Sequence, residues 1–485
     1  MTNVFTLASV ISPVLAEAGS RLPFLIGLLI AAVALLLVLI ILQKMQAFLA
    51  LLITSAFTAL LGGVPITESP GVIEKGMGSN LGFIAVIIGV GAIFGAMLEH
   101  SGGAQRLANS LLKIFGEKRA SWAMLLTGFI LSIPVFLDVG LVIVAPIIYS
   151  LTKKSGKSLL KFGLPLVAGM AVTHAFVPPT PGPAYVAYVL GVDMGTMIMV
   201  GVAVGLPTAI VASMVAGKMA DKLYIGVPEA LDNTPDRDES KLPSFGLVLL
   251  ITMLPIALIL LGTAIERFVL SRAIPDGLAM GDYNAALAEQ IAAASMPMQV
   301  CVFLGKPIVA LIIGTLAATL FLGTMRGVGR DKLLEIATKA LGPAGIIILI
   351  TGAGGVFKTV LKQTGIADAL ASAFPESMPL VVIAFLLTLV IRIAQGSATV
   401  AMVTAAALIG TLAADGGYSA IQMALVVVAI AAGATAVSHV NDSGFWIISR
   451  YFGMSVKDTL KSWSVVSTVI GLVGFGLALI GSFIF

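Results

Sequence analysis

Residues 73–107 read IEKGMGSNLGFIAVIIGVGAIFGAMLEHSGGAQRL, and residues 336–370 read IATKALGPAGIIILITGAGGVFKTVLKQTGIADAL. The two stretches align without a gap, and both contain apolar runs long enough to cross roughly 30 Å of hydrocarbon. Such self-similarity predicts that the chain contains two halves of related structure. The matching residues are Ile73 and Ile336, Gly82 and Gly345, Gly89 and Gly352, Gly91 and Gly354, Phe94 and Phe357, Leu98 and Leu361, Gly102 and Gly365, and Leu107 and Leu370.

The composition of the whole chain favours membrane-spanning helices. Of its 485 residues, 59% are hydrophobic and 11% are charged, whereas about a quarter of a soluble domain is charged. The sequence therefore predicts an all-α polytopic membrane protein and excludes a soluble globular one. Long apolar runs cover residues 24–42, 81–98, 195–217, 247–262, 308–322 and 464–485.

Charge and cysteine content exclude other classes of site. The net charge is +4, but the basic residues are spread over loops without interleaved aromatic residues, so we expect no nucleic-acid binding. Cys301 is the only cysteine, which excludes a disulfide framework and a cysteine-based metal site. No basic leader precedes the modest apolar stretch at the start of the chain. We therefore expect residues 1–22 to be a short uncleaved segment at the membrane interface.

The distribution of Lys and Arg predicts the orientation of the chain, because cytoplasmic loops of membrane proteins are rich in these residues. If the N-terminus is extracytoplasmic, most of the 28 basic residues fall in cytoplasmic loops, and the C-terminus is also extracytoplasmic. Residues 81–98 then run inward and residues 344–361 run outward, so the two halves are inverted copies. Inverted repeats with interrupted helices indicate a solute site at the midplane of a transporter. The alternative is a duplication that only enlarged a helical bundle.

The first interruption of an apolar run is IPVFLDVGLV, residues 133–142. Its two arms are too short to span the membrane alone, and both flanking loops are basic. The pattern predicts a re-entrant hairpin that opens to the cytoplasm with its tip near residues 136–139. Asp138 is costly in hydrocarbon and is a candidate for solute binding or proton uptake, together with its neighbours Val139 and Gly140. A structural carboxylate that caps the second arm is the alternative.

The second interruption is THAFVPPTPGP, residues 173–183. Its prolines break a helix, because proline lacks the amide donor and clashes with the preceding turn. His174 titrates near neutrality and is a second candidate for proton uptake, although a structural, hydrogen-bonded histidine is the alternative. The candidate solute ligands in this break are Thr173, His174, Pro178, Pro179, Thr180 and Gly182.

The third interruption is IRIAQGSATVAM, residues 391–402, which predicts the tip of a second hairpin that opens outward. The N-terminus of the helix that follows attracts anions. Gly396 allows a ligand to approach the backbone, and neutral hydrogen-bonding groups surround it. The candidate ligands are Gln395, Gly396, Ser397 and Thr399.

Arg392 is the one basic residue embedded in an apolar run. Its guanidinium group suits a carboxylate of the solute. Pairing with Asp138 or Asp442, or an outward-reaching side chain, are the alternatives.

The fourth interruption is SHVNDSGFWI, residues 438–447. Its first two residues occupy the position that Thr173 and His174 occupy in the first half, which argues against a surface loop. Such dense hydrogen-bonding groups suit a polyhydroxylated ligand. The candidate ligands are Ser438, His439, Asn441, Asp442 and Ser443.

These four stretches together resemble the gluconate permease family of proton symporters, within the broad ion transporter superfamily. THAFVPPTPGP, RIAQGSATVAM and HVNDSGFW are similar to characteristic segments of that family, as is SGGAQRLA at residues 101–108. The resemblance extends from about Ile73 to the C-terminus. It implies proton-driven import of gluconate or another small hydroxy-carboxylate, without enzymatic activity and with no cofactor or metal beyond the coupling ion. Some members carry a histidine where this chain has Thr180, which weakens a proton-carrying role at that position.

The resemblance also implies a homodimer that works as an elevator in a bacterial-type cytoplasmic (inner) membrane. Scaffold helices are expected in residues 23–120 and 244–377, the latter with an external loop at 264–302, and residues 218–243 form a cytoplasmic linker. The transport domain comprises residues 121–217 (hairpin 121–152, broken helix 160–190, helix 195–217) and 378–485 (hairpin 378–413, broken helix 419–449, helix 461–485).

Two other functions fit parts of this pattern. Carbonyl groups at the breaks could bind Na⁺, which would make the chain a sodium-coupled carrier of carboxylates or of amino acids such as D-serine. An intramembrane hydrolase could use Asp138, His174 and Asp442. The sequence contains neither metal-ligand spacing nor a nucleophile elbow, which disfavours the hydrolase.

Overall fold

The computed structural model describes residues 21–228, 239–274, 280–366, 369, 378–413 and 417–485. Over these residues the chain forms helices and no strands, which confirms the all-helical class. The predicted N-terminal segment 1–22 lies almost wholly outside the described residues. Parts of the predicted linker 218–243, of the external loop 264–302 and of the end of the second scaffold segment also lie outside them.

The first half of the chain contains nine of the described α-helices, and several of their ends have local causes. Gly156 adopts a left-handed conformation that stops a helix, and the Asp193 side chain caps the start of another by accepting a hydrogen bond from the Thr196 amide. The helices are α2 (Arg21–Leu37), α3 (Ala47–Leu61), α4 (Ser69–His100), α5 (Gly103–Phe115), α6 (Ala120–Leu131), α7 (Leu137–Ser155), α8 (Leu160–Phe176), α9 (Pro181–Val189) and α10 (Met194–Ala220); a π-helical turn (Val38–Leu42) extends α2.

The second half follows a similar order after a first group of four helices. Ser419 and Gln422 form a reciprocal capping box at the start of one helix, and Gly396 ends another in the left-handed conformation. The helices are α11 (Phe245–Ile265), α12 (Met280–Ala293), α13 (Met296–Gly305), α14 (Pro307–Ala318), α15 (Arg330–Gln363), α17 (Leu380–Gln395), α18 (Ala398–Leu412), α19 (Ala420–Thr435), α20 (Ser443–Phe452), α21 (Val456–Lys461) and α22 (Trp463–Ile484).

Eight helices in the described residues are long and apolar enough to cross a membrane. The chain is therefore a multi-pass membrane protein, as its composition predicts. The broken helix formed by α8 and α9 is the most buried of these spans, because the rest of the protein surrounds it. The spans are Leu22–Leu42, Leu81–His100, Leu160–Val189, Met194–Ala220, Phe245–Leu270, Pro307–Arg326, Arg330–Gln363 and Val456–Ile484.

Helices α4 and α15, which carry the repeated stretches, pack against each other along their length. A methyl group on Gly76 would lie 2.7 Å from the Cα atom of Val356, whereas one on Gly89 would lie 3.7 Å from the Leu341 side chain. Because residue numbers rise along α4 as they fall along α15, the two helices run antiparallel.

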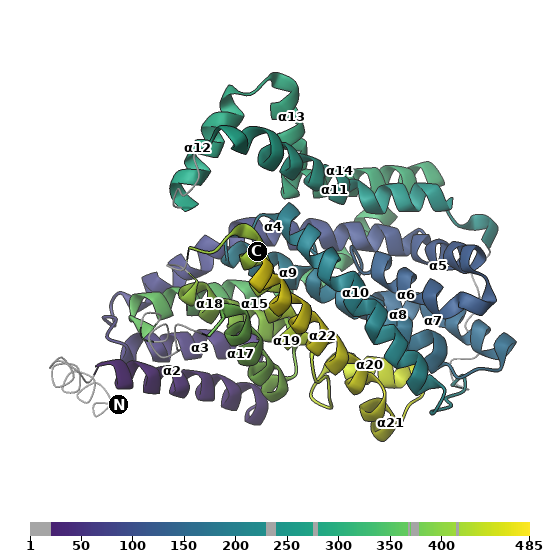
Figure 1. The fold of residues 1–485 in the computed structure, drawn as a ribbon, viewed down its shortest axis with the longest axis horizontal. Helices are drawn as coiled ribbons and strands as arrows, with labels where there is room; N and C mark the ends of the chain where they lie inside the picture. Colours follow the sequence, from purple (N-terminus) through teal and green to yellow (C-terminus); the bar gives the residue numbers. More distant parts are fainter. Residues whose placement is uncertain (1–20, 229–238, 275–279, 367–368, 370–377, 414–416) are drawn as a thin grey trace.

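The remaining helices form corresponding contacts in both halves. Helix α6 packs on α8 and α8 on α10, while α17 packs on α19 and α19 on α22. In Figure 1, α6, α8 and α10 lie together on one side, α15, α17 and α18 lie on the other, and α19 and α22 lie between them. One apolar cluster extends through both groups and forms the main core.

Glycines allow α6 and α8 to approach very closely. A Cβ atom on Gly128 would overlap the carbonyl oxygen of Leu166, and one on Gly169 would overlap the carbonyl oxygen of Leu125. Neither neighbour is the flexible end of a side chain, so relief requires the two helices to separate. Helices α6 and α8 run parallel, because the Ser121 hydroxyl at the start of α6 donates a 2.8 Å hydrogen bond to the Lys161 carbonyl at the start of α8.

Replacement of Gly169 by alanine is expected to destabilise the protein by about 1–3 kcal/mol, which is the usual cost of overpacking a tight core. The measurement is thermal unfolding of the purified protein in detergent. Gly82→Ala is the matched control, since a Cβ atom there meets nothing within 4 Å and alanine favours a helix by about 1 kcal/mol. Equal melting temperatures for the two variants would contradict the packing argument.

The structure corrects the predicted tip of the first hairpin. The non-helical residues between α6 and α7 are 132–136, earlier than the predicted 136–139. The α conformation is disfavoured just before Pro134, which ends α6, and Phe136 is extended with φ −61° and ψ 148°, so α7 begins immediately after it. Asp138 and Val139 therefore lie in the first turn of α7.

The structure also differs from the predicted external loop at residues 264–302. Helices α12 and α13 lie in this stretch, and α11 continues into it as a π-helical turn at Glu266–Leu270. Polar residues suggested a loop, but the alanine-rich sequence AALAEQIAA has high helix propensity.

Candidate functional site

The predicted break in the proline-rich segment separates α8 from α9. Helix α8 ends at Phe176, and Val177 is extended with φ −117° and ψ 115°. The Thr180 hydroxyl donates a 2.7 Å hydrogen bond to the Val177 carbonyl, and α9 begins at Pro181. Prolines at the first positions of α9 need no amide partner, which explains where the helix resumes. The predicted ligands of this break are buried except His174, which is half-buried: Thr173, Pro178, Pro179, Thr180 and Gly182.

The first hairpin tip lies against this break. The ring of Phe136 meets the ring of His174 edge to face, with 5.9 Å between the ring centres. Residues 133–136 and 179–181 also line a small cavity of about 20 Å³ beside α4, which is room for about one water molecule.

Asp138 lies exposed in the first turn of α7, two residues after Phe136, whose ring contacts His174. The N-cap residue of α7 is Phe136, whose side chain makes no capping hydrogen bond. Val139 is half-buried, and Gly140 packs against the methyl group of Met170. The two proton-uptake candidates therefore belong to segments that contact each other through Phe136 and His174.

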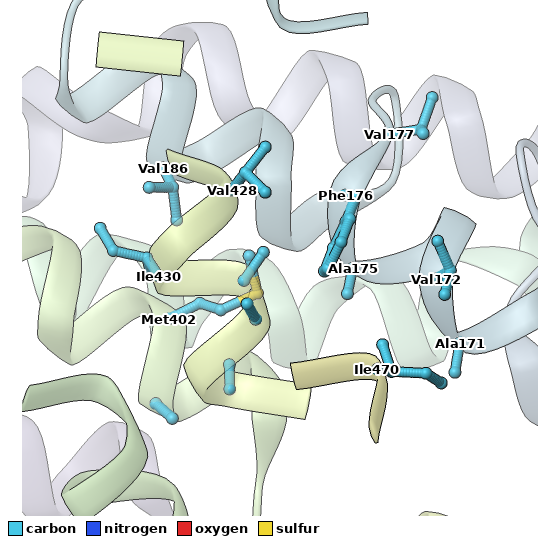
Figure 2. Close-up of a cluster of buried hydrophobic side chains, with 14 of the residues drawn as sticks. Ala171, Val172, Ala175, Phe176, Val177, Val186, Met402, Val428, Ile430 and Ile470 are labelled. Atoms are coloured by element: carbon cyan, nitrogen blue, oxygen red, sulfur yellow. The ribbon is translucent and has the colours of Figure 1, made fainter. Parts of the chain in front are cut away.

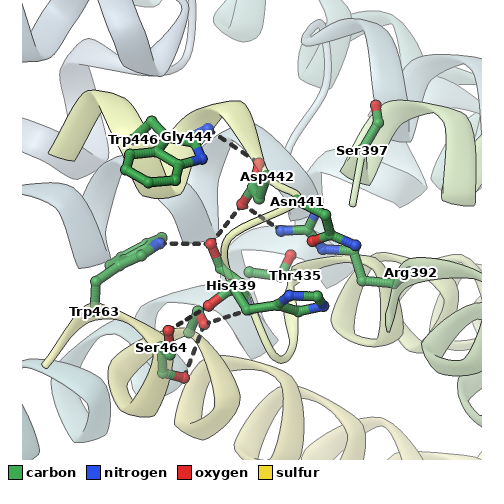
Figure 3. A network of polar contacts seen from close by, with 12 residues as sticks. Arg392, Ser397, Thr435, His439, Asn441, Asp442, Gly444, Trp446, Trp463 and Ser464 are labelled. Atoms are coloured by element: carbon green, nitrogen blue, oxygen red, sulfur yellow. Dashed lines mark hydrogen bonds and ion pairs between the residues drawn. The ribbon is translucent and has the colours of Figure 1, made fainter. Parts of the chain in front are cut away.

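The second hairpin tip is tied to the second break by an ion pair. Nη2 of Arg392, in the last turn of α17, lies 2.5 Å from Oδ2 of Asp442. Asp442 also accepts hydrogen bonds from the Ser438 hydroxyl at 2.5 Å and from the Gly444 amide at 3.0 Å, which caps α20. Figure 3 shows Arg392 and Gly444 near Asp442. Of the alternatives for Arg392, the structure shows the pairing with Asp442, and a side chain that is 3% exposed does not reach outward.

Further hydrogen bonds hold the second break in place. The Trp463 indole donates to the Ser438 hydroxyl at 2.8 Å, and the Ser464 hydroxyl donates to the Ser438 carbonyl. The Asn441 amide nitrogen donates to the Ile393 carbonyl at 3.0 Å, and Nε2 of His439 lies 3.0 Å from the same oxygen. Two residues within the break thus bind the carbonyl end of α17.

The other candidates in the second hairpin tip lie close to this network. Gly396 has φ 84°, and its Cα packs against Asn441 so closely that a Cβ atom would overlap the Asn441 backbone. The Ser397 hydroxyl accepts a 3.4 Å hydrogen bond from the Val400 amide, and the Gln395 amide nitrogen donates to the Ser397 carbonyl at 3.3 Å. Thr399 is half-buried and Ser443 is exposed.

The two halves of the site contact each other through apolar groups. Sulfur of Met402 in α18 would lie 2.8 Å from a Cβ atom on Gly182 in α9. Figure 2 shows Met402 in a cluster of buried side chains with Phe176 and Val177 at the end of α8 and with Val428 and Ile430 of α19. The structure thus brings the first tip to the first break, the second tip to the second break, and the two breaks to a shared apolar core.

Several polar atoms near the tips and breaks are buried and have no hydrogen-bond partner among the described residues. Most buried polar groups in proteins are paired, so these atoms are candidates for solute contacts. Ser132 and Tyr185 were not predicted from the sequence; the hydroxyl two residues before Pro134 was the signal for Ser132. Trp463 was also missed, because nothing local links it to Ser438. The unpartnered atoms at the site are Ser132 Oγ, Thr173 Oγ1, His174 Nδ1, Tyr185 Oη, Arg392 Nε and Nη1, and Gln395 Oε1.

A larger cavity, of about 210 Å³, lies away from these residues. It is lined by α9 and α10 on one side and by α11, α13 and α14 on the other, and Glu266 and Lys306 form a 2.6 Å ion pair at its edge. None of the predicted site residues lines it.

A family model described as GntP family permease matches residues 24–484. The chain belongs to this family. The resemblance to gluconate permeases is thereby confirmed, and the chain is a membrane permease. Related proteins match nearly the whole length of the chain.

The relatives of this permease have related names. It is 36% identical over 447 residues to the low-affinity gluconate transporter of Escherichia coli (strain K12), with 92% of this chain and 95% of the relative covered. It is 35% identical to the gluconate permease of Pseudomonas aeruginosa, with 93% and 95% covered. It is 38% identical to the inner membrane permease YgbN of E. coli (strain K12), with 93% and 97% covered.

Solved transporters share the fold of this permease at low sequence identity. The YdaH transporter of Alcanivorax borkumensis matches with a TM-score of 0.60 and 14% identity, over 90% of this chain and 97% of that one. MtrF of Neisseria gonorrhoeae, which is assigned to a class of antimetabolite efflux pumps, matches with a TM-score of 0.61 and 14% identity, over 87% and 85%. At this identity the likeness concerns the fold alone.

Proposed function

We propose that this permease imports gluconate or a closely related small hydroxy-carboxylate together with protons. The observation that carries the proposal is the pairing of each helix break with a hairpin tip inside the protein. Backbone groups freed at the breaks and unpartnered side chains at the tips provide ligands for a polar solute where hydrocarbon provides none. The names of the relatives from E. coli and P. aeruginosa support gluconate as the solute.

The solute would lie between the two tips and the two breaks. Ser397, Thr399, Asn441 and Ser443, together with amides at helix N-termini, would contact it. Proton uptake at Asp138, with His174 as the second candidate, would remove negative charge near an anionic solute and favour its binding.

The proposal includes two inverted halves and elevator movement in a homodimer. The antiparallel packing of α4 and α15, and the corresponding contacts of α6 with α8 and of α17 with α19, support the inverted relationship. The Lys and Arg distribution supports extracytoplasmic N- and C-termini. Residues 121–217 and 378–485 would move against the scaffold in the inner membrane.

The test is uptake of labelled gluconate into proteoliposomes in sodium-free buffer, with the lumen more alkaline than the medium. We expect accumulation of intact gluconate, and inhibition by other sugar acids that exceeds inhibition by glycerate or D-serine. A requirement for Na⁺ would instead favour the sodium-coupled carrier, and strongest inhibition by D-serine would favour an amino-acid substrate. Recovery of a hydrolysed product would favour the hydrolase.

A further inference from the structure

Two side chains in the last turn of α17 carry unused hydrogen-bonding atoms. Arg392 and Gln395 are three positions apart, so they lie on the same face of the helix. Both are buried, with 3% and 8% of their surface exposed. Nε and Nη1 of Arg392 and Oε1 of Gln395 have no hydrogen-bond partner in the described part of the chain.

The protein groups nearest to Arg392 are already occupied. One Asp442 oxygen accepts from Arg392 Nη2 and from Ser438, and the other accepts from the Gly444 amide. Ser438 in turn accepts from Trp463. Pairs of arginine and carboxylate are frequently bidentate, but this one uses a single nitrogen of the guanidinium group. Nε and Nη1 of Arg392 therefore remain without an acceptor among the described residues, and an unmade hydrogen bond at a buried charged group is costly.

We propose that Nη1 of Arg392 donates a hydrogen bond to the carboxylate of the solute and that Oε1 of Gln395 accepts a hydrogen bond from a hydroxyl group on the adjacent carbon. The assignment rests on the proposed function and deepens it, because it identifies the substrate class as 2-hydroxy-carboxylates. A hydrogen bond from a charged guanidinium nitrogen to a carboxylate oxygen is stronger than one between neutral groups. The Gln395 amide nitrogen donates to the Ser397 carbonyl, and the free amide oxygen of Gln395 is a hydrogen-bond acceptor. A 2-keto or 2-deoxy acid has no donor at that carbon and is disfavoured.

Neighbouring residues shield and orient the guanidinium group of Arg392. Asn441 is exposed and lies beside the guanidinium group in Figure 3, while its amide nitrogen binds the Ile393 carbonyl one residue further along α17. Asn441 thus separates Arg392 from the solvent side of the break. The Asp442 contact fixes Nη2, which orients the planar guanidinium group with its free Nη1 and reduces the entropy lost when a carboxylate binds.

The first test measures selectivity in proteoliposomes, by competition of gluconate, 2-deoxygluconate and 2-ketogluconate against labelled gluconate. The wild-type protein is expected to prefer gluconate over both analogues. Gln395→Met keeps the size of the side chain and removes its acceptor, and we expect the preference to fall about tenfold. Gln422→Met is the matched control, because Gln422 caps α19 and is remote from Arg392 in sequence and in the network. Unchanged selectivity in Gln395→Met would overturn the assignment of Gln395.

The second test separates carboxylate binding by Arg392 from its pairing with Asp442. The double variant Arg392→Gln, Asp442→Asn removes both charges and leaves no unpaired buried ion. We expect it to unfold at a higher temperature than Arg392→Gln alone, and yet to bind gluconate at least about tenfold more weakly than the wild-type protein. Wild-type affinity in a folded double variant would show that Arg392 serves only the ion pair. Absence of gluconate uptake by the wild-type protein would instead refute the proposed function itself.

Discussion

Asp442→Ala is expected to lower the free energy of unfolding by about 3–5 kcal/mol, because it leaves the charge of buried Arg392 without its counter-ion. It also removes the acceptor for Ser438 and the cap of α20. The Arg392 contact joins the second hairpin to the second break, and the other two contacts hold the break against the start of α20. Thermal unfolding in detergent measures the change in stability, and a wild-type sample stabilised with lipid serves as the reference.

Asp193→Ala is the matched control for this substitution. Asp193 also caps a helix, through a 2.8 Å hydrogen bond from the Thr196 amide, but it is exposed. The loss of a cap alone costs about 1 kcal/mol. A destabilisation by Asp442→Ala that does not exceed that of Asp193→Ala would show that the ion pair contributes nothing to stability.

Asp138→Asn is expected to abolish accumulation driven by a pH gradient while solute exchange continues. If one proton enters with each solute anion, a gradient of one pH unit drives accumulation of up to about tenfold, since about 1.4 kcal/mol corresponds to a factor of ten. The asparagine side chain keeps the size of Asp138 but cannot take up a proton. The variant would then bring gluconate only to equal concentrations on both sides.

The measurement compares gradient-driven uptake with counterflow in the same proteoliposomes. His174→Gln is the companion variant, because His174 contacts Phe136 at the same hairpin tip and is the other candidate for proton uptake. Unchanged accumulation in Asp138→Asn, together with its loss in His174→Gln, would transfer the coupling role to His174. Loss of counterflow in Asp138→Asn would indicate solute binding by Asp138 in place of coupling.

The sequence predicted the interruptions of the helices well, because their causes are local. Pro178, Pro179 and Pro181 cannot continue a helix, and the dense polar residues at 438–443 follow a long apolar run. Both breaks occur in the structure where these residues lie. The repeated stretches likewise correspond to the two long helices α4 and α15.

The sequence did not predict which distant side chains contact each other in the fold. Arg392 and Asp442 are separated by 50 positions, and Asp138 was an equally good partner for Arg392 until the fold placed the second tip on the second break. Trp463 reaches Ser438 through packing of α22 on α19, which no local pattern reveals. The first tip was placed too late because the apolar residues before Pro134 continue the pattern of α6 without marking where it ends.

The lengths of α4 and α15 impose a demand on the surrounding lipid. Helices of 32 and 34 residues measure about 48–51 Å, which exceeds a hydrocarbon layer of roughly 30 Å. Neither helix fits within this layer along the membrane normal, so each must tilt steeply or extend into the headgroup region. The two helices run antiparallel, so their polar N-terminal segments lie at opposite ends of the pair. These segments are SPGVIEKGMGSN in α4 and RDKLLEIATKA in α15.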